Sequence, residues 1–321
     1  MDSSLGGFIL GLVILILVII TLVIIFAVFF VASNGINSIK NSIAQILDFF
    51  SSERNLDLCQ RAEIIEIPGQ FEAIEKGVYS RQNARMCLAL SINTTAALCG
   101  GQDPPVPEGF EEAIPLKVGG PGGRISYPIG YWYFRPRNVR ERQEGIGIFV
   151  FGSNIDLGKF LEYATLEQIP PTEINGYVNG MEINRQMYLL YRIVRPFLRL
   201  QWARSFLQVD KLLITGHGVG AGLAGIAALD FNEQLAGHYS FSAPNIGNPI
   251  FSQEFARLIN SSYRVVNSAD WLPGLPPVLI RGYRYLQADS QTISFNRNLG
   301  SALENNLQAY LDEFMLVPMT V

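Results

Sequence analysis

Residues 211–222 read Lys211-Leu-Leu-Ile-Thr-Gly-His-Gly-Val-Gly-Ala-Gly222, and this stretch decides the fold. Its apolar start is typical of a short buried strand, and its glycines form a tight turn. A helix of small residues is predicted directly after the turn, at 223–229. A strand, a tight turn and a helix in this order are typical of α/β proteins, in which helices cross back over a mostly parallel sheet.

Strands and helices alternate on both sides of this turn. The further predicted elements are strands at 130–134 and 147–151, a helix at 181–207, a strand at 238–242, a helix around 251–258 and a strand at 263–266. Because strands alternate with helices, we predict an α/β fold, with a mostly parallel sheet that carries helices on both faces.

The composition excludes several classes of protein. The chain has 321 residues, is 49% hydrophobic, and carries 24 basic against 28 acidic residues. This balance argues against a basic nucleic-acid surface and against disorder. Three Cys and two His are too few for a disulfide scaffold or for a zinc or His-rich metal site. We therefore expect no metal and no cofactor.

The apolar residues concentrate at the N-terminus. Residues 8–32 form an uncharged run of 25 residues. As a helix this run is about 37 Å long, which is enough to cross a hydrocarbon core of roughly 30 Å. A cleaved signal peptide would have a shorter apolar region after basic residues, and Met1–Gly7 contains no Lys or Arg. We predict a single-pass transmembrane anchor at 1–33.

The remainder divides into a stalk and one globular domain. Residues 34–56 have the spacing of an amphipathic helix, which could pack on the domain, lie on the membrane or mediate self-association; its apolar positions include Ile36, Ile39, Ile43 and Phe50. Residues 57–321 form the predicted α/β domain. Within it, residues 100–123 are rich in Gly and Pro and predict a long exposed loop.

Two kinds of signal disagree about membrane topology. Lys40 and Arg54 follow the apolar run while no basic residue precedes it, which favours a cytosolic globular domain. Glycosylation sequons at Asn93 and Asn260 would be usable only on the luminal or extracellular side. We follow the charge rule and expect the cytosolic side.

The glycine-rich turn has two interpretations. Residues 220–225 satisfy the dinucleotide pattern G-x-G-x-x-G, but the next strand ends in Ser242-Ala-Pro244 rather than in the required acid. The alternative is a nucleophile elbow, G-x-S-x-G, in which a sharp turn presents a side chain above the sheet. Residues 216–220 fit this pattern with Gly218 at the nucleophile position.

The elbow and the segments around it resemble class 3 (fungal-type) lipases. Residues 214–224 resemble the family's G-H-S-L-G-G-A-L-A elbow, and residues 241–248 resemble F-G-x-P-R-V-G-N. Residues 263–277 are similar to Y-R-V-x-x-x-x-D-x-V-P-x-L-P-P, and residues 282–284 fit a later G-Y-R strand. Residues 149–154 lie where the family has V-x-F-R-G-T. The resemblance implies an α/β-hydrolase fold.

The resemblance also implies a degenerate catalytic triad. Gly218 occupies the position of the nucleophilic Ser, and Asp270 keeps the position of the catalytic Asp. Asn305 is the best match for the catalytic His, with Asn306 one residue away; an amide cannot act as the general base. Asn154 and Val219 fall at oxyanion-hole positions. His217 is part of the elbow, and His238 begins the next strand, so neither replaces the missing base.

Three functions follow as hypotheses. The first is a membrane-anchored, catalytically inactive lipase-like protein that binds a lipid or acyl chain, or acts as a scaffold in lipid metabolism. The second is an active lipid esterase with a non-standard nucleophile such as Ser153 or Ser242, which the lack of a partner His disfavours. The third is a purely structural component of a membrane-bound assembly. The expected partners are the bilayer, a bound lipid and a protein that contacts the amphipathic segment.

Overall fold

The computed structural model describes residues 63–100, 102–119, 126–153, 167–280, 283–284, 286–288, 290–297 and 304–316. All of these residues belong to one compact unit of the chain. The predicted anchor at 1–33 and the amphipathic segment at 34–56 lie outside the described residues. Among the helices that are described, none has both the length and the apolar character that a membrane crossing needs.

The domain is built on a seven-stranded sheet with the order β1-β2-β3-β6-β7-β8-β11. Neighbouring strands from β3 to β11 pair in parallel, while β1 and β2 form the antiparallel edge. The bounds are β1 Glu112–Gly119, β2 Ser126–Arg135, β3 Ile146–Phe151, β6 Lys211–His217, β7 Leu235–Phe241, β8 Ser262–Asn267 and β11 Gln291–Phe295. The predicted mostly parallel α/β sheet is confirmed.

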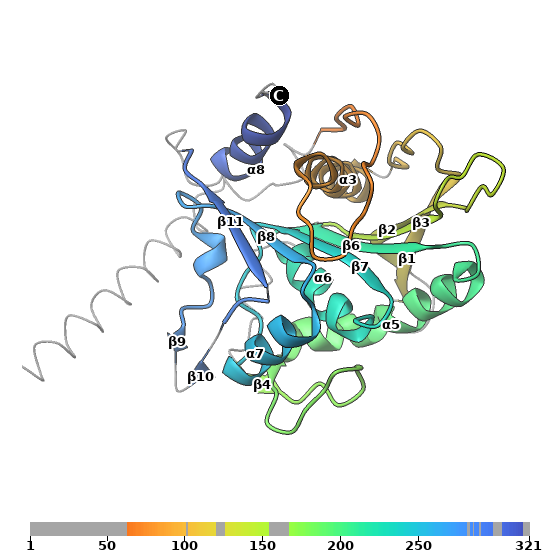
Figure 1. Cartoon of the computed structure of the whole chain (residues 1–321). Helices are drawn as coiled ribbons and strands as arrows, with labels where there is room; N and C mark the ends of the chain where they lie inside the picture. The colour runs from red at the N-terminus through yellow and green to blue at the C-terminus, as the bar shows by residue number, and fades with distance from the viewer. Residues whose placement is uncertain are drawn as a thin grey trace, which may run out of the picture. The chain divides into compact units, whose positions relative to one another are not determined.

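Helices cover both faces of this sheet, as predicted (Figure 1). One face carries α3 (Arg81–Gly100) with α8 (Glu304–Leu311), which continues into η2 (Asp312–Leu316). The other face carries α5, α6 and α7. Their bounds are α5 Arg185–Ser205, α6 Val219–Asp230 and α7 Pro249–Leu258. Short elements complete the description: β4 Gln168–Ile169 with β5 Ile183–Asn184, η1 Leu272–Gly274, and β9 Leu279–Ile280 with β10 Tyr283–Arg284.

The long predicted helix at 181–207 begins later than expected. Residues 183–184 pair with residues 168–169 as a small antiparallel ladder, so the helix starts at Arg185. The side chain of Asn184 accepts hydrogen bonds from the backbone N–H groups of Gln186 and Met187, both at 3.1 Å. An Asn in this position satisfies helix donors that have no partner inside the helix. The cap therefore sets the start of α5.

The prediction of an exposed loop throughout 100–123 is wrong. Residues 112–119 form β1, which pairs with β2 at the edge of the sheet. Leu116 is fully buried, and the register shifts between Pro115 and Lys117. A proline is tolerated on an edge strand because an outward-facing backbone position needs no N–H donor. The strand arises from pairing with β2, which the local Gly and Pro signals did not indicate.

Helix α3 was not predicted, although it is almost entirely buried. Its small polar residues lie among the buried ones, so its sequence does not show the separate polar and apolar faces of an amphipathic helix. These polar groups are satisfied locally or by a neighbouring segment: the Ser91 hydroxyl donates to the Cys87 carbonyl at 2.8 Å, and the Asn93 amide exchanges two hydrogen bonds with the backbone of Ile65. The helix is stable at this depth because its polar side chains have partners.

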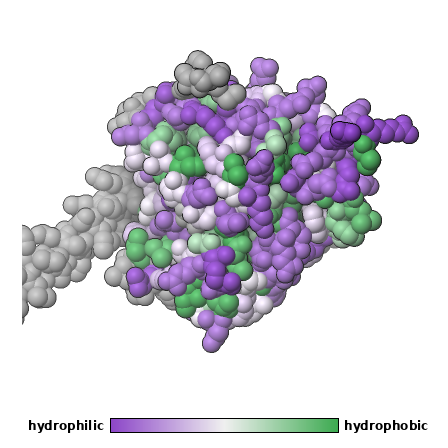
Figure 2. All heavy atoms as spheres, viewed as in Figure 1, coloured by the Kyte–Doolittle hydropathy of each residue, from purple (hydrophilic) through white to green (hydrophobic). Residues whose placement is uncertain are grey.

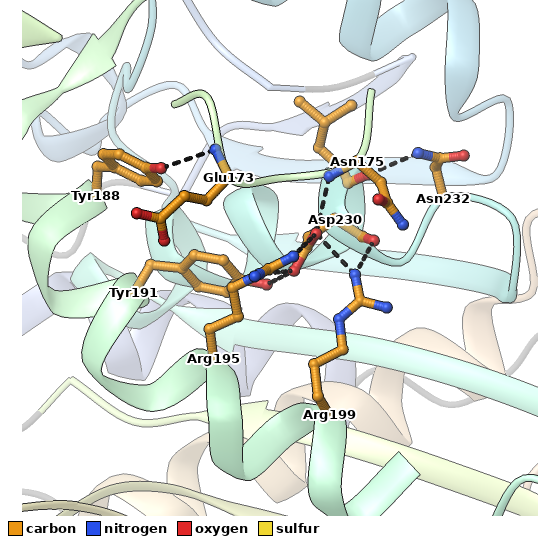
Figure 3. Close-up of polar contacts among 9 residues, drawn as sticks. Glu173, Asn175, Tyr188, Tyr191, Arg195, Arg199, Asp230 and Asn232 are labelled. Atoms are coloured by element: carbon orange, nitrogen blue, oxygen red, sulfur yellow. Dashed lines mark hydrogen bonds and ion pairs between the residues drawn. The ribbon is translucent and has the colours of Figure 1, made fainter. Parts of the chain in front are cut away.

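A buried ionic cluster holds the C-terminal end of α6 against α5 (Figure 3). Asp230 is fully buried and accepts hydrogen bonds from Tyr191 (2.6 Å), Arg195 (2.7 Å) and Arg199 (2.8 Å). Burial alone would raise the pKa of Asp230, but hydrogen bonds from Arg195 and Tyr191 outweigh it and lower the pKa. The cluster fixes the far end of the helix whose N-terminus forms the glycine turn.

Candidate functional site: a modified nucleophile elbow

Gly218 stands at the turn between β6 and α6 in a backbone conformation that residues with a side chain rarely adopt. Its backbone angles are φ 58° and ψ −127°, and its N–H donates to the Phe241 carbonyl at 2.9 Å. The flanking glycines are equally constrained. A Cβ on Gly216 would lie 2.6 Å from the backbone of Gly220, and a Cβ on Gly220 would lie 2.5 Å from the Phe151 carbonyl oxygen. The turn thus has the close strand–helix approach of an elbow.

Ser153 occupies the space directly beside Gly218. A Cβ built on Gly218 would lie 2.9 Å from the Ser153 hydroxyl oxygen and 3.6 Å from a methyl group of Leu272. Ser153 is buried, and its backbone N–H donates to the Thr95 hydroxyl at 3.1 Å. A side chain at position 218 would therefore have to displace the Ser153 hydroxyl.

Asp270 lies beyond the C-terminal end of β8 and is held by three donors. Its Oδ2 accepts hydrogen bonds from the Ser242 hydroxyl at 2.5 Å and from the Tyr310 hydroxyl at 3.2 Å. Its Oδ1 accepts one from the Leu272 backbone N–H at 3.0 Å. Ser242 directly follows β7, whereas Tyr310 belongs to α8. Three distant parts of the chain therefore meet at the carboxyl ends of the strands, where α/β proteins place their sites.

The electrostatics of this cluster are dominated by burial. Burial raises the pKa of Asp270, and hydrogen bonds from Ser242, Leu272 and Tyr310 offset part of the rise. Burial, followed by the nearby Asp270 carboxylate, raises the pKa of Tyr310 well above its ordinary value. Tyr310 is therefore a neutral hydrogen-bond donor throughout the physiological pH range.

Both histidines of the chain are buried: His217 lies directly before Gly218, and His238 lies within β7. The ring of His217 packs edge-on against Tyr310, with 5.8 Å between the ring centroids. His238 is fully buried in β7, and its Nδ1 lies 2.8 Å from the Ser262 hydroxyl. Burial lowers the pKa of His238 to about 3, so this ring is neutral at physiological pH. The described contacts of Asp270 are thus with hydroxyl groups and a backbone amide, whereas a triad aspartate accepts a hydrogen bond from histidine.

The other predicted site residues are described only in part. Val219 is buried as the first residue of α6, with its backbone at the helix N-terminus. Asn154 lies outside the described residues. Asn305 and Asn306 stand in the first turn of α8, and their side chains lie outside what the structure describes. Their assignment to the triad and oxyanion positions stays a prediction.

Sequence reasoning missed the contacts that organise this site. It treated Ser242 as a possible nucleophile and gave Tyr310 no role in the site, whereas both bind Asp270. It also missed Arg264, which donates to the backbone carbonyls of Ala243 and Pro273, both at 3.0 Å. Within the described part of the chain, no group of three His, Cys, Asp or Glu residues is arranged to hold a metal ion.

Comparisons with known proteins agree with this fold. Residues 152–280 match the family model for lipase (class 3). The chain is 36% identical over 81 residues to the secreted mono- and diacylglycerol lipase MDL2 of Malassezia globosa, which is 24% of this chain and 26% of that protein. The chain thus spans about a quarter of the length of that curated relative.

Two solved structures show the same architecture. A mono- and diacylglycerol lipase from Aspergillus oryzae has a TM-score of 0.50 at 14% identity, covering 71% of this chain and 85% of that one. A Rhizomucor miehei lipase–propeptide complex has a TM-score of 0.50 at 16% identity, covering 76% and 81%. The fold is that of the α/β-hydrolases. The chain is related to the class 3 lipases, as its motifs predict.

Proposed function

We propose that this protein is a membrane-anchored, lipase-like protein that does not hydrolyse esters by the Ser–His–Asp mechanism. Its role would be to bind a lipid or acyl chain, or to act as a scaffold. The observation that carries the proposal is the hydrogen bonding of Asp270: its carboxylate oxygen Oδ2 accepts hydrogen bonds from the hydroxyl groups of Ser242 and Tyr310. The resemblance assigns that carboxylate to a histidine partner.

The nucleophile and the base both support this proposal. Gly218 has no side chain that could attack an ester. The chain contains two His, and both are buried in contacts described above. General-base activation contributes about 10²–10⁴-fold to such reactions, so a hydroxyl without it would be a poor nucleophile.

The second candidate is an active hydrolase that uses Ser153 or Ser242. The position of Ser153, beside the elbow glycine, favours this candidate. Against it, Ser242 is fully buried and donates to Asp270. A carboxylate that binds a hydroxyl without an intervening imidazole lacks the proton relay of a triad. The third candidate, a purely structural component of a membrane-bound assembly, differs from the lipid-binding form of our proposal in having no bound lipid.

We further propose that the globular domain lies on the luminal or extracellular side, opposite to the expectation from Lys40 and Arg54. Cys99 is disulfide-bonded, and disulfides persist in oxidising compartments. The relative from Malassezia globosa is named as secreted. Of the two sequons, Asn93 is buried with its amide hydrogen-bonded, while Asn260 is exposed. Only Asn260 is suited to carry a glycan in the folded protein.

The test uses the full chain extracted in mild detergent. Native mass spectrometry should detect a co-purifying lipid, and the same sample should hydrolyse short- and long-chain esters no faster than buffer. The matched controls are Ser153→Ala and Ser242→Ala. Saturable hydrolysis by the wild type that one of these changes abolishes in a folded variant would establish the second candidate, whereas an inactive protein without lipid would favour the purely structural one.

A further inference from the structure

The outer face of α5 is composed of only two kinds of side chain. Every exposed residue of this helix is either apolar or an arginine. The exposed apolar residues are Leu189, Ile193, Pro196, Phe197, Leu200 and Ala203. Large apolar side chains on a surface helix ordinarily face the core, so a continuous exposed set needs an explanation.

These apolar residues form one stripe, because positions 189, 193, 197 and 200 share a face of a helix with 3.6 residues per turn. The opposite face already supplies the core: Tyr191, Val194 and Leu198 are fully or almost fully buried. The exposed stripe is therefore not needed to pack α5 against the core. It continues past the helix into Phe206 and Leu207, which are also exposed. In Figure 2, hydrophobic groups are visible on the side where the C-terminal end of α5 lies in Figure 1.

Arginines border the stripe, and the helix contains no acidic residue. Four of them are paired with acids from other elements: Arg185 with Glu167, Arg192 with Glu173, and Arg195 and Arg199 with the buried Asp230. The fifth, Arg204, is exposed in the last turn. Five arginines thus meet three carboxylates, so the helix and its ion-pair partners together carry an excess of positive charge. Asp230 also fixes two of the arginines along the border (Figure 3).

We propose that this stripe of α5 docks onto the surface of a lipid bilayer. Its Leu, Ile and Phe side chains enter the boundary between headgroups and acyl chains, and the bordering arginines lie at the level of the lipid phosphates. A basic amphipathic helix is typical of membrane-surface segments. The inference rests on the proposed membrane anchor, because residues 8–32 would hold the domain within reach of the bilayer.

A second copy of the chain fits this surface less well. Pairing two such stripes would bring two arginine-bordered faces together, and α5 carries no acid that could neutralise the arginines of the other copy. Juxtaposed like charges oppose association. Lipid phosphate groups supply the complementary charge, because arginine pairs with phosphate through strong, charge-assisted hydrogen bonds.

The experiment uses the full chain reconstituted into vesicles of phosphatidylcholine and phosphatidylserine. Ile193→Trp places a fluorophore on the stripe, and Val78→Trp is the matched control: the native side chains are 50% and 55% exposed. Val78 precedes α3, which covers the other face of the sheet. Lipids brominated along the acyl chain should quench most of the fluorescence that Ile193→Trp adds and leave that of Val78→Trp unchanged. Leu200→Trp provides a second reporter on the stripe.

Acrylamide, a water-soluble quencher, separates the alternatives. If acrylamide quenches the stripe reporters and brominated lipid does not, the stripe is exposed to water. Reporters protected from both quenchers would show a face covered by protein. Either result overturns the docking proposal. Flotation of the vesicles after a carbonate wash tests the anchor separately: protein that floats without stripe quenching retains its anchor and refutes only the role of α5.

Discussion

The hydroxyl of Ser242 donates a hydrogen bond of 2.5 Å to Oδ2 of Asp270, the carboxylate at the aspartate position of the lipase resemblance. In a working triad this carboxylate orients a histidine. Here it joins the end of β7 to the end of β8, and its contact with Tyr310 adds α8 to the junction. Asp270 therefore ties together the ends of β7 and β8 and helix α8.

Removing this tie should destabilise the domain in a pH-dependent way. Ser242→Ala deletes one donor to a buried carboxylate, and we expect a loss of about 1–3 kcal/mol. The folded pKa of Asp270 is raised, so its contribution to stability is present at low pH and declines as pH rises through the folded pKa. Loss of a donor raises that pKa further. Urea unfolding at about pH 3, below the unfolded pKa of aspartate, and at pH 8 should therefore show a larger deficit at pH 8; an equal deficit at both values would contradict a raised folded pKa.

The conformation of Gly218 should make any side chain there costly. Gly218→Ala should lower the free energy of unfolding by about 1–3 kcal/mol, because φ is 58° and the new Cβ meets the Ser153 hydroxyl. Gly274→Ala is the matched control, since nothing lies within 4 Å of its Cβ position. Thermal and urea unfolding should separate the two variants. If Gly218→Ala is as stable as the control, the turn is not a strained elbow.

Rebuilding the triad should restore weak hydrolysis only in combination. Gly218→Ser alone should stay inactive because its hydroxyl has no base. Gly218→Ser with Asn305→His, or with Asn306→His, supplies the base, whose contribution is about 10²–10⁴-fold. Adding Ser242→Ala should increase the rate, because it opens Asp270 to the new imidazole. Ester hydrolysis by purified variants measures this; activity in Gly218→Ser alone would instead point to an existing base.

The buried cluster at the end of α6 should dominate the acid stability of the domain. Asp230→Asn leaves Arg195 and Arg199 without their carboxylate, and breaking a buried pair costs about 3–5 kcal/mol. The folded pKa of Asp230 is lowered, so its stabilising effect is present above the unfolded pKa and is lost as pH falls. Unfolding curves of the variant and the wild type should converge at low pH. The control Glu254→Gln breaks an exposed pair with Arg257 and should cost less than about 1 kcal/mol.

Removal of residues 1–33 should release the protein from carbonate-washed membranes, because the uncharged run at 8–32 is the predicted anchor.

Expression of the full chain in a secretory system should add a glycan at Asn260 and none at Asn93. Glycosidase treatment followed by peptide mass spectrometry detects both. Complete absence of glycan together with a reduced Cys99 would contradict the luminal placement and favour a cytosolic domain.

The sequence by itself determined the α/β fold and the position of the elbow. Residues 211–222 carry both signals locally: an apolar run for the strand, and glycines where the helix crosses close to it. The spacing of such signals along the chain also located most of the other strands and helices. The sequence also shows that position 218 is a glycine, which has no nucleophilic side chain, and that the 321 residues contain two histidines.

Only the tertiary structure decided what surrounds these positions. Ser242 and Tyr310 reach Asp270 across 28 and 40 residues, and β1 became a strand through pairing with β2. Helix α3 is buried because its polar groups find partners at that depth. The sequence did not separate the two apolar faces of α5, since both follow helical spacing; packing on α6 buries one and leaves Ile193 and its neighbours exposed. Such contacts depend on which distant segments of the chain pack together, and the local spacing of residues does not indicate this.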